Sequence, residues 1–371
     1  MRIVSVTREF PSISETFIGL RFGLLLSRGW DAHVLCERSW VDPWSGYADV
    51  DEQTVRHRIH VAGSARARAD LLAELAPAAV HVEWGTLVSS VIAALPPDRR
   101  PPLLVSFQGY DICYAGLESE PGAYDDVWRS ASAIHFSSQD LLDRALQRGM
   151  PSDLHAEVIT PLTDLSAFVR LDDAREVPGA IGTTDRPLRL LTVSRLHWKK
   201  GFEYSLRAIA ILRERGIACE FRIVGGGDAV LAIEHACRRL GLSRAVNLLG
   251  ALAPAAVREQ MLWADIALVS SVSEGFCVAA LEAQAMRLPV VASDAEGLRE
   301  NVADGVTGFI VPKRNPRAIA DRLEQLVTDA DLRRRLAEAG PRHAAERFDP
   351  VEGVARFERL YHRVASRKLG R

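Results

Sequence analysis

The stretch SEGFCVAALEA, residues 273–283, holds two carboxylates eight positions apart, Glu274 and Glu282, with a glycine directly after the first. The apolar run ADIALVSS precedes it, and the alanine-rich segment after it favours a helix that begins near Phe276. Strand, tight turn and helix in this order are the unit of a parallel α/β sheet. The N–H groups at such a helix start attract anions, and Gly275 lets the backbone approach a ligand closely.

The same alternation of short apolar runs and helix-period segments continues through the whole chain, which predicts parallel sheets with helices on both faces. The strands expected in the first half are 3–6, 32–36, 80–83, 103–106, 133–136 and 157–159. Those expected in the second half are 188–194, 220–224, 246–249, 266–269, 290–292 and 309–311. We therefore predict an α/β fold with two Rossmann-like, doubly wound domains that face a cleft.

A segment rich in Gly, Pro, Asp and Thr, residues 170–187, has no periodic apolar face and is typical of a linker. It divides the chain into an N-terminal domain, residues 1–170, and a C-terminal domain, residues 187–349. Residues 350–368 form an amphipathic pattern with Val354, Phe357, Leu360, Tyr361 and Val364 on one side. Its basic residues fit either a solvated helix face or peripheral contact with an anionic membrane surface.

Bulk composition narrows the class of function. A chain of 371 residues with 48% hydrophobic and 25% charged residues is typical of a globular protein with two cores. The net charge of −2 gives no basic excess for nucleic acid. The five cysteines are odd in number and lack a CxxC spacing, which favours a reducing cytoplasm over disulfides or a zinc site. The first residues carry too short an apolar run for a signal peptide.

A second cluster of candidate residues lies in SRLHWKKGFEYSL, residues 194–206. Arg195 follows a predicted strand and Lys200 precedes a predicted helix, so two cations meet at a strand–helix junction. Arginine binds a pyrophosphate through a bidentate fork and lysine as a point charge. The alternatives are a surface loop for the cations, and a helix-start charge and a solvated helix face for Glu274 and Glu282.

Glycines follow two further predicted strands, in IVGGGD, residues 223–228, and in NLLG, residues 247–250. Gly225 and Gly226 lack the spacing of a dinucleotide fingerprint, and no Walker lysine follows them. They fit a tight turn beside a nucleoside, and Gly250 fits a position where the backbone reads a base edge. Ordinary turn glycines are the alternative at all three positions.

Together, RLHWKKG, GGGD, LLG and EGFCVAALEA closely resemble the retaining glycosyltransferases of family 4 over nearly all of residues 188–312. The family signature, two acids separated by seven residues, matches Glu274 and Glu282. The resemblance implies the GT-B fold, in which the last helix crosses back onto the N-terminal domain. It also implies transfer from a UDP- or GDP-sugar with retention, without metal or another cofactor.

The resemblance assigns roles by position. Arg195 and Lys200 would hold the diphosphate, Glu274 the donor sugar and Glu282 the ribose. The residues expected to line the donor are Gly225, Gly226, Gly250, Gly275, Phe276, Cys277 and Glu282. In SFQGYD, residues 106–111, Gln108 stands where the family has a histidine, and glutamine cannot carry a proton. We count Gln108 with Arg195, Lys200 and Glu274 as catalytic, as a group that holds a sugar hydroxyl.

The acceptor should bind to the N-terminal domain. REFPSISETFI, residues 8–18, resembles the opening of a polysaccharide-building subset of the family, which makes Ser14 and Glu15 acceptor candidates. Its alternative is a capping box between Ser12 and Glu15. Glu83 would bind an acceptor hydroxyl or pair with a basic neighbour, and Asp111 would contact a sugar or cap its own loop.

We therefore predict a retaining glycosyltransferase that moves a hexosyl or aminohexosyl group to a hydroxyl acceptor, in the cytoplasm or at the inner membrane face. The acceptor is a surface or lipid-linked glycan, or a natural product such as an aminoglycoside. The rival hypotheses are a nucleotide-sugar epimerase and a binding partner with a decayed site. The sequence leaves the nucleotide base, the sugar, the regiochemistry and the oligomeric state open.

Overall fold

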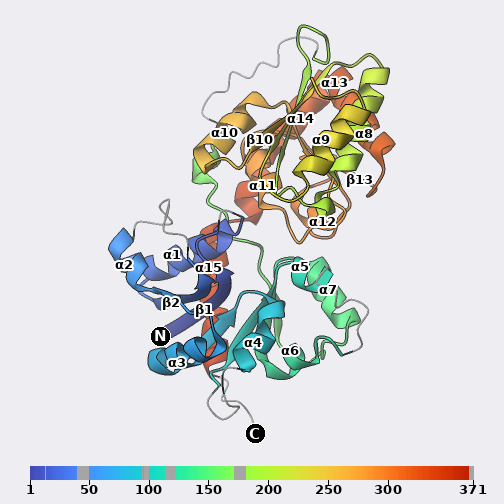
Figure 1. Cartoon of the computed structure of the whole chain (residues 1–371). Coiled ribbons are helices and arrows are strands. Elements are labelled where there is room, and N and C mark those ends of the chain that lie inside the picture. The colour runs from blue at the N-terminus through green and yellow to red at the C-terminus, as the bar shows by residue number, and fades with distance from the viewer. Residues whose placement is uncertain are drawn as a thin grey trace. The chain divides into compact units, whose positions relative to one another are not determined.

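The computed structural model of the chain describes residues 1–12, 14–39, 50–93, 95, 100–113, 122–170 and 181–366. The chain forms two compact units, each with one parallel sheet (Figure 1). Unit 1 contains Met1–Thr163 and Asp349–Arg371, and unit 2 contains Asp164–Phe348. The predicted α/β class is confirmed. Most of the expected linker, residues 171–180, lies outside the described residues.

The sheet of unit 1 has seven strands in the order β3-β2-β1-β4-β5-β6-β7. The strands are β1 (Arg2–Glu9), β2 (Asp31–Arg38), β3 (Ile59–Val61), β4 (Ala79–Val82), β5 (Leu103–Phe107), β6 (Ala131–Phe136) and β7 (Ala156–Val158). The helical segments before the last helix are α1 (Thr16–Ser27), α2 (Glu52–His57), α3 (Ala65–Leu75), η1 (Gly85–Leu87), α4 (Val88–Ile92), α5 (Tyr110–Cys113), α6 (Asp125–Ser130) and α7 (Gln139–Gln147).

The C-terminal helix α15 (Pro350–Ser366) belongs to unit 1, where it contacts α1, β4 and β5. The five apolar residues expected on one face of this helix are all buried. They pack with side chains of β1, β2 and α1 in one cluster, while the opposite face of the sheet packs against the helices between β3 and β7. The predicted return of the last helix to the N-terminal domain is therefore confirmed.

The sheet of unit 2 has six parallel strands in the order β10-β9-β8-β11-β12-β13. The strands are β8 (Leu188–Val193), β9 (Cys219–Val224), β10 (Val246–Gly250), β11 (Ile266–Val269), β12 (Val290–Ser293) and β13 (Gly308–Val311). The helical segments are η4 (Ser166–Phe168), η5 (Trp198–Lys200), α8 (Phe202–Glu214), α9 (Val230–Arg239), α10 (Pro254–Trp263), α11 (Val278–Ala285), α12 (Leu298–Asn301), α13 (Pro316–Thr328) and α14 (Ala330–Arg347).

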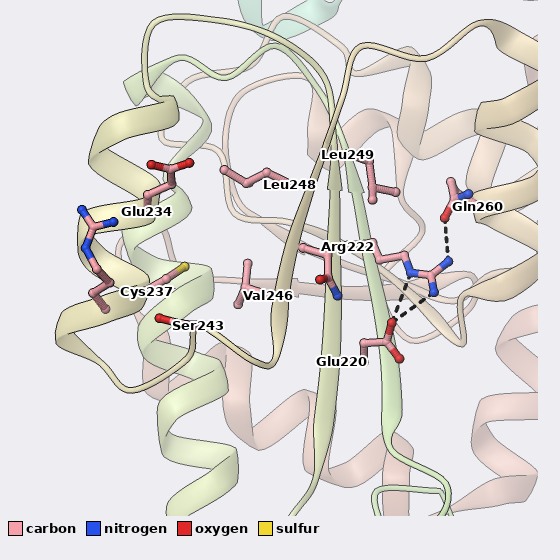
Figure 2. A pocket seen from close by; sticks show the side chains of 11 residues that line it. Glu220, Arg222, Glu234, Cys237, Ser243, Val246, Leu248, Leu249 and Gln260 are labelled. Carbon is pink, nitrogen blue, oxygen red and sulfur yellow. Dashed lines mark hydrogen bonds and ion pairs between the residues drawn. The ribbon is translucent and has the colours of Figure 1, made fainter.

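A pocket of about 920 Å³ lies along the edge strand β10, between α9, β9 and α10 (Figure 2). None of the predicted site residues lines it. Its central charge, Arg222, donates to Glu220 and Gln260 and stacks on the ring of Trp263 at 3.7 Å. Because these polar groups satisfy one another, we do not assign the donor to this pocket.

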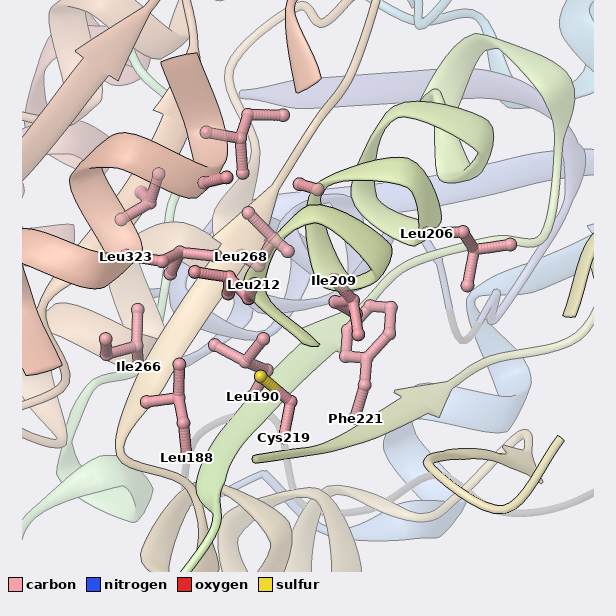
Figure 3. Close-up of a cluster of buried hydrophobic side chains, with 14 of the residues drawn as sticks. Leu188, Leu190, Leu206, Ile209, Leu212, Cys219, Phe221, Ile266, Leu268 and Leu323 are labelled. Carbon is pink, nitrogen blue, oxygen red and sulfur yellow. The ribbon is translucent and has the colours of Figure 1, made fainter. Parts of the chain in front are cut away.

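Alternating apolar residues of the strands build the core of unit 2. Leu188 and Leu190 of β8 and Phe221 of β9 pack against α8, where Leu206, Ile209 and Leu212 recur at helical spacing (Figure 3). A second cluster on the other face of the sheet contains Leu281 and Met286 of α11 and its following turn. Burial of both faces explains why these strands are apolar almost throughout.

In each sheet the chain reverses its direction of winding at one point, and ligands of such sheets bind outside the carboxyl ends of the strands there. In unit 2 this point lies between β8 and β11, and in unit 1 between β1 and β4. The loop with Arg195 and Lys200 follows β8, and the loop with Glu274 follows β11. The topology thus brings together two motifs that are about 70 residues apart in the sequence.

Candidate functional site

At the carboxyl edge of unit 2, Lys200 and Glu274 form an ion pair, and Ser271 Oγ donates to Glu274 Oε2 at 3.1 Å. The Glu274 side chain is buried. Burial alone would raise its pKa, but the charges of Lys200 and Lys199 outweigh burial and hold the pKa of Glu274 below its ordinary value. The carboxylate is therefore ionised at neutral pH and fixed in place.

The backbone around Lys200 is fixed to the end of β11. Gly201 has φ 63°, and a Cβ there would lie 2.2 Å from the carbonyl oxygen of Ser270. Ser270 Oγ donates to the carbonyl of Gly201 at 2.9 Å, and Val272 N donates to the carbonyl of Lys199 at 2.8 Å. Only a glycine permits this approach, so Gly201 lets Lys200 reach Glu274.

Arg195 lies at the same edge but, unlike Lys200, forms no ion pair with a residue that the structure describes. Its side chain is exposed and donates no hydrogen bond to any residue that the structure describes. The loop that carries it is rigid, because Gly225 and Gly227 press against it. A Cβ at Gly225 would lie 1.8 Å from the carbonyl oxygen of Ser194, and one at Gly227 would lie 2.2 Å from that of Leu196. An uncommitted guanidinium on a fixed backbone is available to a ligand.

This packing supplies a structural reason for the glycines after β9. Gly225 N donates to the carbonyl of Gly250 at 2.7 Å, and Leu196 N donates to the carbonyl of Gly226 at 2.8 Å. The turn interpretation therefore accounts for Gly225 and Gly226 without a ligand. Gly250 differs, because it has φ 71° and a Cβ there would meet no atom within 4 Å. The space beside Gly250 remains open for a base.

The turn from Glu274 to Cys277 differs from its prediction. Helix α11 begins at Val278 rather than near Phe276, because Cys277 has φ 73°, in the left-handed region. Three carbonyls of this turn are bound from one side: Gly297 N donates to Glu274 O at 3.2 Å, and Asn301 Nδ2 donates to Phe276 O at 3.1 Å and Cys277 O at 2.9 Å.

The N–H groups of the same turn are uncommitted. Those of Gly275, Phe276 and Cys277 donate to no residue that the structure describes. Consecutive free amides at the start of an eight-residue helix form a concave site with positive potential. Burial and the neighbouring Glu274 raise the pKa of the Cys277 thiol to about 12, so this residue acts through its backbone and not as a thiolate.

Glu282 lies one to two turns into α11, half-buried, and its carboxylate has no hydrogen bond to the described part of the chain. Burial raises the pKa of Glu282 to about 7. The structure thus keeps Glu282 out of the Lys200–Glu274 pair and leaves both oxygens of its carboxyl group available. A carboxylate in this state can accept hydrogen bonds from a diol.

Two candidate acceptor residues of unit 1, Asp111 and Glu83, are bonded to other parts of the fold, unlike Arg195 and Glu282 in unit 2. Asp111 is fully buried and accepts the amides of Gly85, Gln108 and Gly109, each at 3.0 Å. Burial raises the pKa of Asp111 to about 6, although the amide hydrogen bonds act in the opposite direction. The geometry matches the loop-capping alternative. Contact between Asp111 and an acceptor stays a prediction, and it would require the buried carboxylate to become exposed.

Glu83 is also fully buried, and its Oε1 pairs with Arg21 of α1. The geometry matches the alternative that Glu83 pairs with a basic neighbour. Arg21 lies 4.6 Å from the ring centre of Phe357 in α15. Burial would lower the pKa of Arg21, but the charge of Glu83 and hydrogen bonds with Glu83 and Tyr361 raise it above its ordinary value. This ion pair therefore holds α1, β4 and α15 together.

A chain of hydrogen bonds continues from this pair through the buried face of the sheet. His135 Nε2 must donate to the carbonyl of Ile159, at 2.7 Å, because a carbonyl only accepts. Neutral His135 then accepts from Ser106 Oγ at 2.7 Å, Ser106 accepts from His81 Nε2 at 2.6 Å, and His81 Nδ1 accepts from Tyr361 at 2.8 Å. Burial lowers the pKa of His81 well below its usual value and that of His135 to about 3, so both rings are neutral.

The capping box predicted at the start of α1 is wrong. The helix begins at Thr16, Glu15 stands at its N-cap position, and the Glu15 side chain caps no helix amide. Ser14 lies in a turn before it, where Ser12 Oγ and Ser14 Oγ are 3.3 Å apart. The capping prediction failed because the turn delays the helix by three residues. Ile13 lies outside the described residues.

Several polar atoms remain without a partner among the described residues at the carboxyl edge of unit 1. They are Thr7 Oγ1, Glu83 Oε2, Gln108 Nε2, Ser137 Oγ and Ser138 Oγ. These atoms lie at the ends of neighbouring strands. For example, β5 and β6 pair with Ser106 opposite His135, and Ser137 N just beyond β6 donates to the carbonyl of Phe107. Gln108 is half-buried, so this row of atoms extends to the surface there.

Sequence reasoning missed part of the unit 2 site. Lys199 was not among the predicted site residues, but it is buried, and its charge lowers the pKa of Glu274. Glu296 is buried too; its Oε2 accepts the amide of Glu274 at 2.7 Å and its Oε1 lies 3.3 Å from Lys313 Nζ. These residues follow β8, β12 and β13, and only the sheet order brings them together. The one available signal was their position directly after predicted strands.

Comparison with known proteins finds similarity concentrated in the second half of the chain. Residues 173–343 match the family model described as glycosyl transferases group 1. The chain is 35% identical over 166 residues to the alpha-D-kanosaminyltransferase of Streptomyces kanamyceticus, covering 44% of this chain and 43% of that protein. It is 34% identical over 205 residues to a D-inositol 3-phosphate glycosyltransferase of Corynebacterium urealyticum, covering 51% of this chain and 46% of that protein. These matches span about half the length of the curated relatives.

Solved structures match over almost the whole chain. Sucrose-phosphate synthase from Thermosynechococcus elongatus has a TM-score of 0.81 at 18% identity, covering 98% of this chain and 99% of that one. Anabaena HepE, in a structure with UDP, has a TM-score of 0.77 at 19% identity, covering 98% and 100%. At this identity the likeness establishes the fold, two Rossmann-like units of the GT-B kind. No helix among the described residues is long and apolar enough to cross a membrane.

Proposed function

We propose that this protein, whose residues 173–343 match the group 1 glycosyl transferases, is a retaining glycosyltransferase. It takes a hexosyl or aminohexosyl group from a nucleotide sugar and passes it to a hydroxyl. The observation that carries the proposal is the unit 2 edge. There the buried Lys200–Glu274 pair, the exposed Arg195 and the three free amides of the 275–277 turn flank one switch point.

The charges at this edge suit a diphosphate that gains negative charge as the glycosidic bond breaks. Arg195 binds one phosphate through its fork, Lys200 lies beside it, and the amides after Glu274 donate to the other. Glu274 has two roles in this proposal. It keeps Lys200 in place, and its ionised carboxylate accepts hydrogen bonds from hydroxyls of the donor sugar. Such fixed cations and dipoles neutralise a leaving phosphate without a metal, which is the course we propose here.

The nucleoside extends along α11 in this proposal. Glu282, with an available carboxyl group, accepts from the ribose diol, and the open space at Gly250 receives the base. The chain's likeness to HepE, whose structure contains UDP, supports a uridine nucleotide as the first donor to test. GDP is the second, since backbone groups beside Gly250 would read the base edge.

The acceptor belongs to the polar edge of unit 1. Among the described residues, the atoms without partners there are hydroxyls, one amide donor and one carboxylate oxygen, and Arg21 beside them already pairs with Glu83. Such a set suits the hydroxyls of a neutral ring better than a phosphate. Gln108, at its surface end, holds a sugar hydroxyl as the sequence predicted. One relative is named for the kanosaminyl group that it transfers and another as a D-inositol 3-phosphate glycosyltransferase, so both glycan and small-molecule acceptors are to be tested.

A direct test is a screen of UDP- and GDP-sugars by thermal shift, followed by an assay of transfer to glycan and aminocyclitol acceptors. A donor that binds the folded chain raises its Tm by mass action. We expect one nucleotide sugar to raise Tm and to yield a glycosylated acceptor with the donor's anomeric configuration. A sugar released in changed form without acceptor would indicate an epimerase, and inverted product would rule out retention. Failure of all donors to bind would remove the proposal.

A further inference from the structure

The orientation of the 275–277 turn in unit 2 is fixed by a neighbouring segment that contains none of the predicted site residues. This segment, residues 294–301, runs from the end of β12 through α12, and we refer to it as the clamp. Gly297 N donates to Glu274 O, and Asn301 Nδ2 donates to the carbonyls of Phe276 and Cys277. Asn301 Oδ1 in turn accepts from Gln284 Nε2 at 2.8 Å. The bonds from Gly297 N and Asn301 Nδ2 all bind carbonyls of the turn.

A peptide group points its N–H and its C=O in opposite directions. Because the clamp holds the carbonyls of the turn on one side, the amides of Gly275, Phe276 and Cys277 point to the other. Close contact keeps this arrangement fixed. A Cβ at Gly297 would lie 2.0 Å from the carbonyl oxygen of Gly275, so the two backbones are in direct contact.

Glu296 is the exception within the clamp, because it binds an amide and not a carbonyl. Its Oε2 accepts Glu274 N at 2.7 Å, which is the amide just before the three free ones. Its Oε1 lies 3.3 Å from Lys313 Nζ, and Lys313 N donates to Asp294 Oδ1 at 2.8 Å. The side chain is 4% exposed and the carboxylate is thus held from two sides.

The backbone of Glu296 is strained. Its φ of 27° lies in the left-handed region, which a non-glycine residue adopts only at a cost in free energy. A glycine would occupy this position without that cost. A carboxylate that is buried, strained and bonded to the turn of a binding site is best explained by a task at that site.

We infer that Glu296 is a positioning residue for the bound diphosphate. By taking the amide of Glu274 and neutralising Lys313, it fixes the first peptide of the turn so that the following three amides converge on one phosphate. Its carboxylate also keeps Lys313 from competing for Glu274, which leaves that acid to Lys200. This inference rests on the proposed function, since it assumes a diphosphate ligand at the turn.

The test compares Glu296→Gly, Glu296→Gln and Glu296→Asp by calorimetric titration with UDP, GDP and ADP, using the one that binds the unaltered chain. Glycine relieves the strained backbone and removes the carboxylate. We expect the folded E296G protein to bind the nucleotide at least tenfold more weakly with Tm unchanged or raised. E296Q keeps an oxygen for the amide and should lose less than threefold. Glu338→Gln, an exposed change in the same unit, is the matched control.

If E296G fails to fold, Glu296→Asp decides the question, because it keeps the charge and withdraws the oxygen by one methylene. It should weaken binding several-fold while thermal unfolding stays cooperative. Unchanged affinity in E296G, or in E296D where E296G does not fold, overturns the inference, as does equal loss in E296Q and E296G. If none of the three nucleotides binds the unaltered chain, the proposed function fails instead.

Discussion

The two sheets of this protein share one topology, but their carboxyl edges are built for opposite purposes. In unit 2 polar groups at the edge are available: Arg195 is exposed, and the Glu282 carboxylate and the three amides of the 275–277 turn bond to no residue that the structure describes. In unit 1 most polar groups at the edge are committed to the fold. Arg21 binds Glu83, Asp111 binds three amides, and a hydrogen-bond chain from Tyr361 to Ile159 joins α15 to the sheet.

This difference shows that buried charge in a Rossmann-like sheet has two uses, which sequence position alone does not separate. Glu83 and Glu274 both follow a strand at a switch point, and both are buried and pair with a cation, Arg21 and Lys200 respectively. The neighbours decide. Glu274 has free amides beside it, whereas Glu83 has α1 and the C-terminal helix.

The sharpest way to break the comparison is to remove the cation of each pair. Arg21→Met leaves Glu83 buried and unpaired, which should lower the free energy of unfolding by about 3–5 kcal/mol without changing donor affinity. Lys200→Met should lower turnover by about 1000-fold, or ~4 kcal/mol of transition-state stabilisation. Urea unfolding and a transfer assay measure the two effects. If Arg21→Met cost activity but no stability, the assignment of roles would be reversed.

A smaller effect is expected from Asp111→Asn. The new amide group cannot accept on its nitrogen, so at least one of the three N–H groups that Asp111 now binds is left buried without a partner. The free energy of unfolding should fall by about 1–3 kcal/mol. Nucleotide affinity, measured by calorimetry, should not change. Wild-type stability together with a raised KM for the acceptor would show that Asp111 contacts substrate after all.

The neutral histidines of unit 1 predict a dependence of stability on pH. The folded pKa of His135, about 3, lies below the ordinary value of 6.5. The unfolded chain therefore binds more protons below pH 6.5, and this stability is lost as the pH falls from 6.5 towards 3. For His135 alone the loss between pH 7 and pH 5 is about 2 kcal/mol.

Fluorescence-monitored urea unfolding at the two pH values measures this loss, and His135→Gln, which cannot be protonated in this range, should reduce it. The same experiment on Arg195→Ala should retain the full pH dependence, because Arg195 is exposed in the other unit. A stability that is flat from pH 7 to pH 5 would contradict the neutral hydrogen-bond chain.

The smallest effect concerns Glu282, whose folded pKa is raised to about 7. A carboxyl group with a raised pKa is most favourable to folding while protonated, so its contribution falls as the pH rises from the unfolded value through 7. Glu282→Gln should therefore be nearly neutral near pH 4.5 and more stable than the unaltered chain at pH 8. The raised pKa corresponds to about 3 kcal/mol there for a fully buried group, and to less for this half-buried one. Nucleotide affinity of the unaltered chain should rise as Glu282 ionises, and that rise should be absent in the variant. An equal pH profile in both would show that Glu282 does not reach the ligand.

Much of the fold could be predicted from the sequence, because the strands of unit 2 are short, mostly apolar segments and the helices between them have clear periods. The start of α1 and of α11 could not, since a turn before α1 and the left-handed Cys277 before α11 shift each helix start. Helix α3 was missed because ARARADLLAEL is rich in charge, although Ser64 caps it through the amide of Ala67.

The candidate site divides in the same way. Lys200 and Glu274 were predicted as neighbours from a motif, and they form an ion pair. Glu296 and Asn301 had no motif, and their roles arise only from the sheet order that places β12 beside β11. The commitment of Glu83 and Asp111 to the fold depends on burial by α1, α15 and the loop after β5. A linear pattern does not contain that information.

The central claim is that the unit 2 edge binds a nucleoside diphosphate through Arg195 and the amides of the 275–277 turn. Calorimetric titration of UDP and GDP into the unaltered chain and into Arg195→Ala tests it most directly, because Arg195 is exposed and its removal should leave the fold intact. We predict one site per chain in the unaltered protein and at least tenfold weaker binding in the variant at the same Tm. Equal affinity in both proteins, or no binding to either nucleotide, would contradict the account.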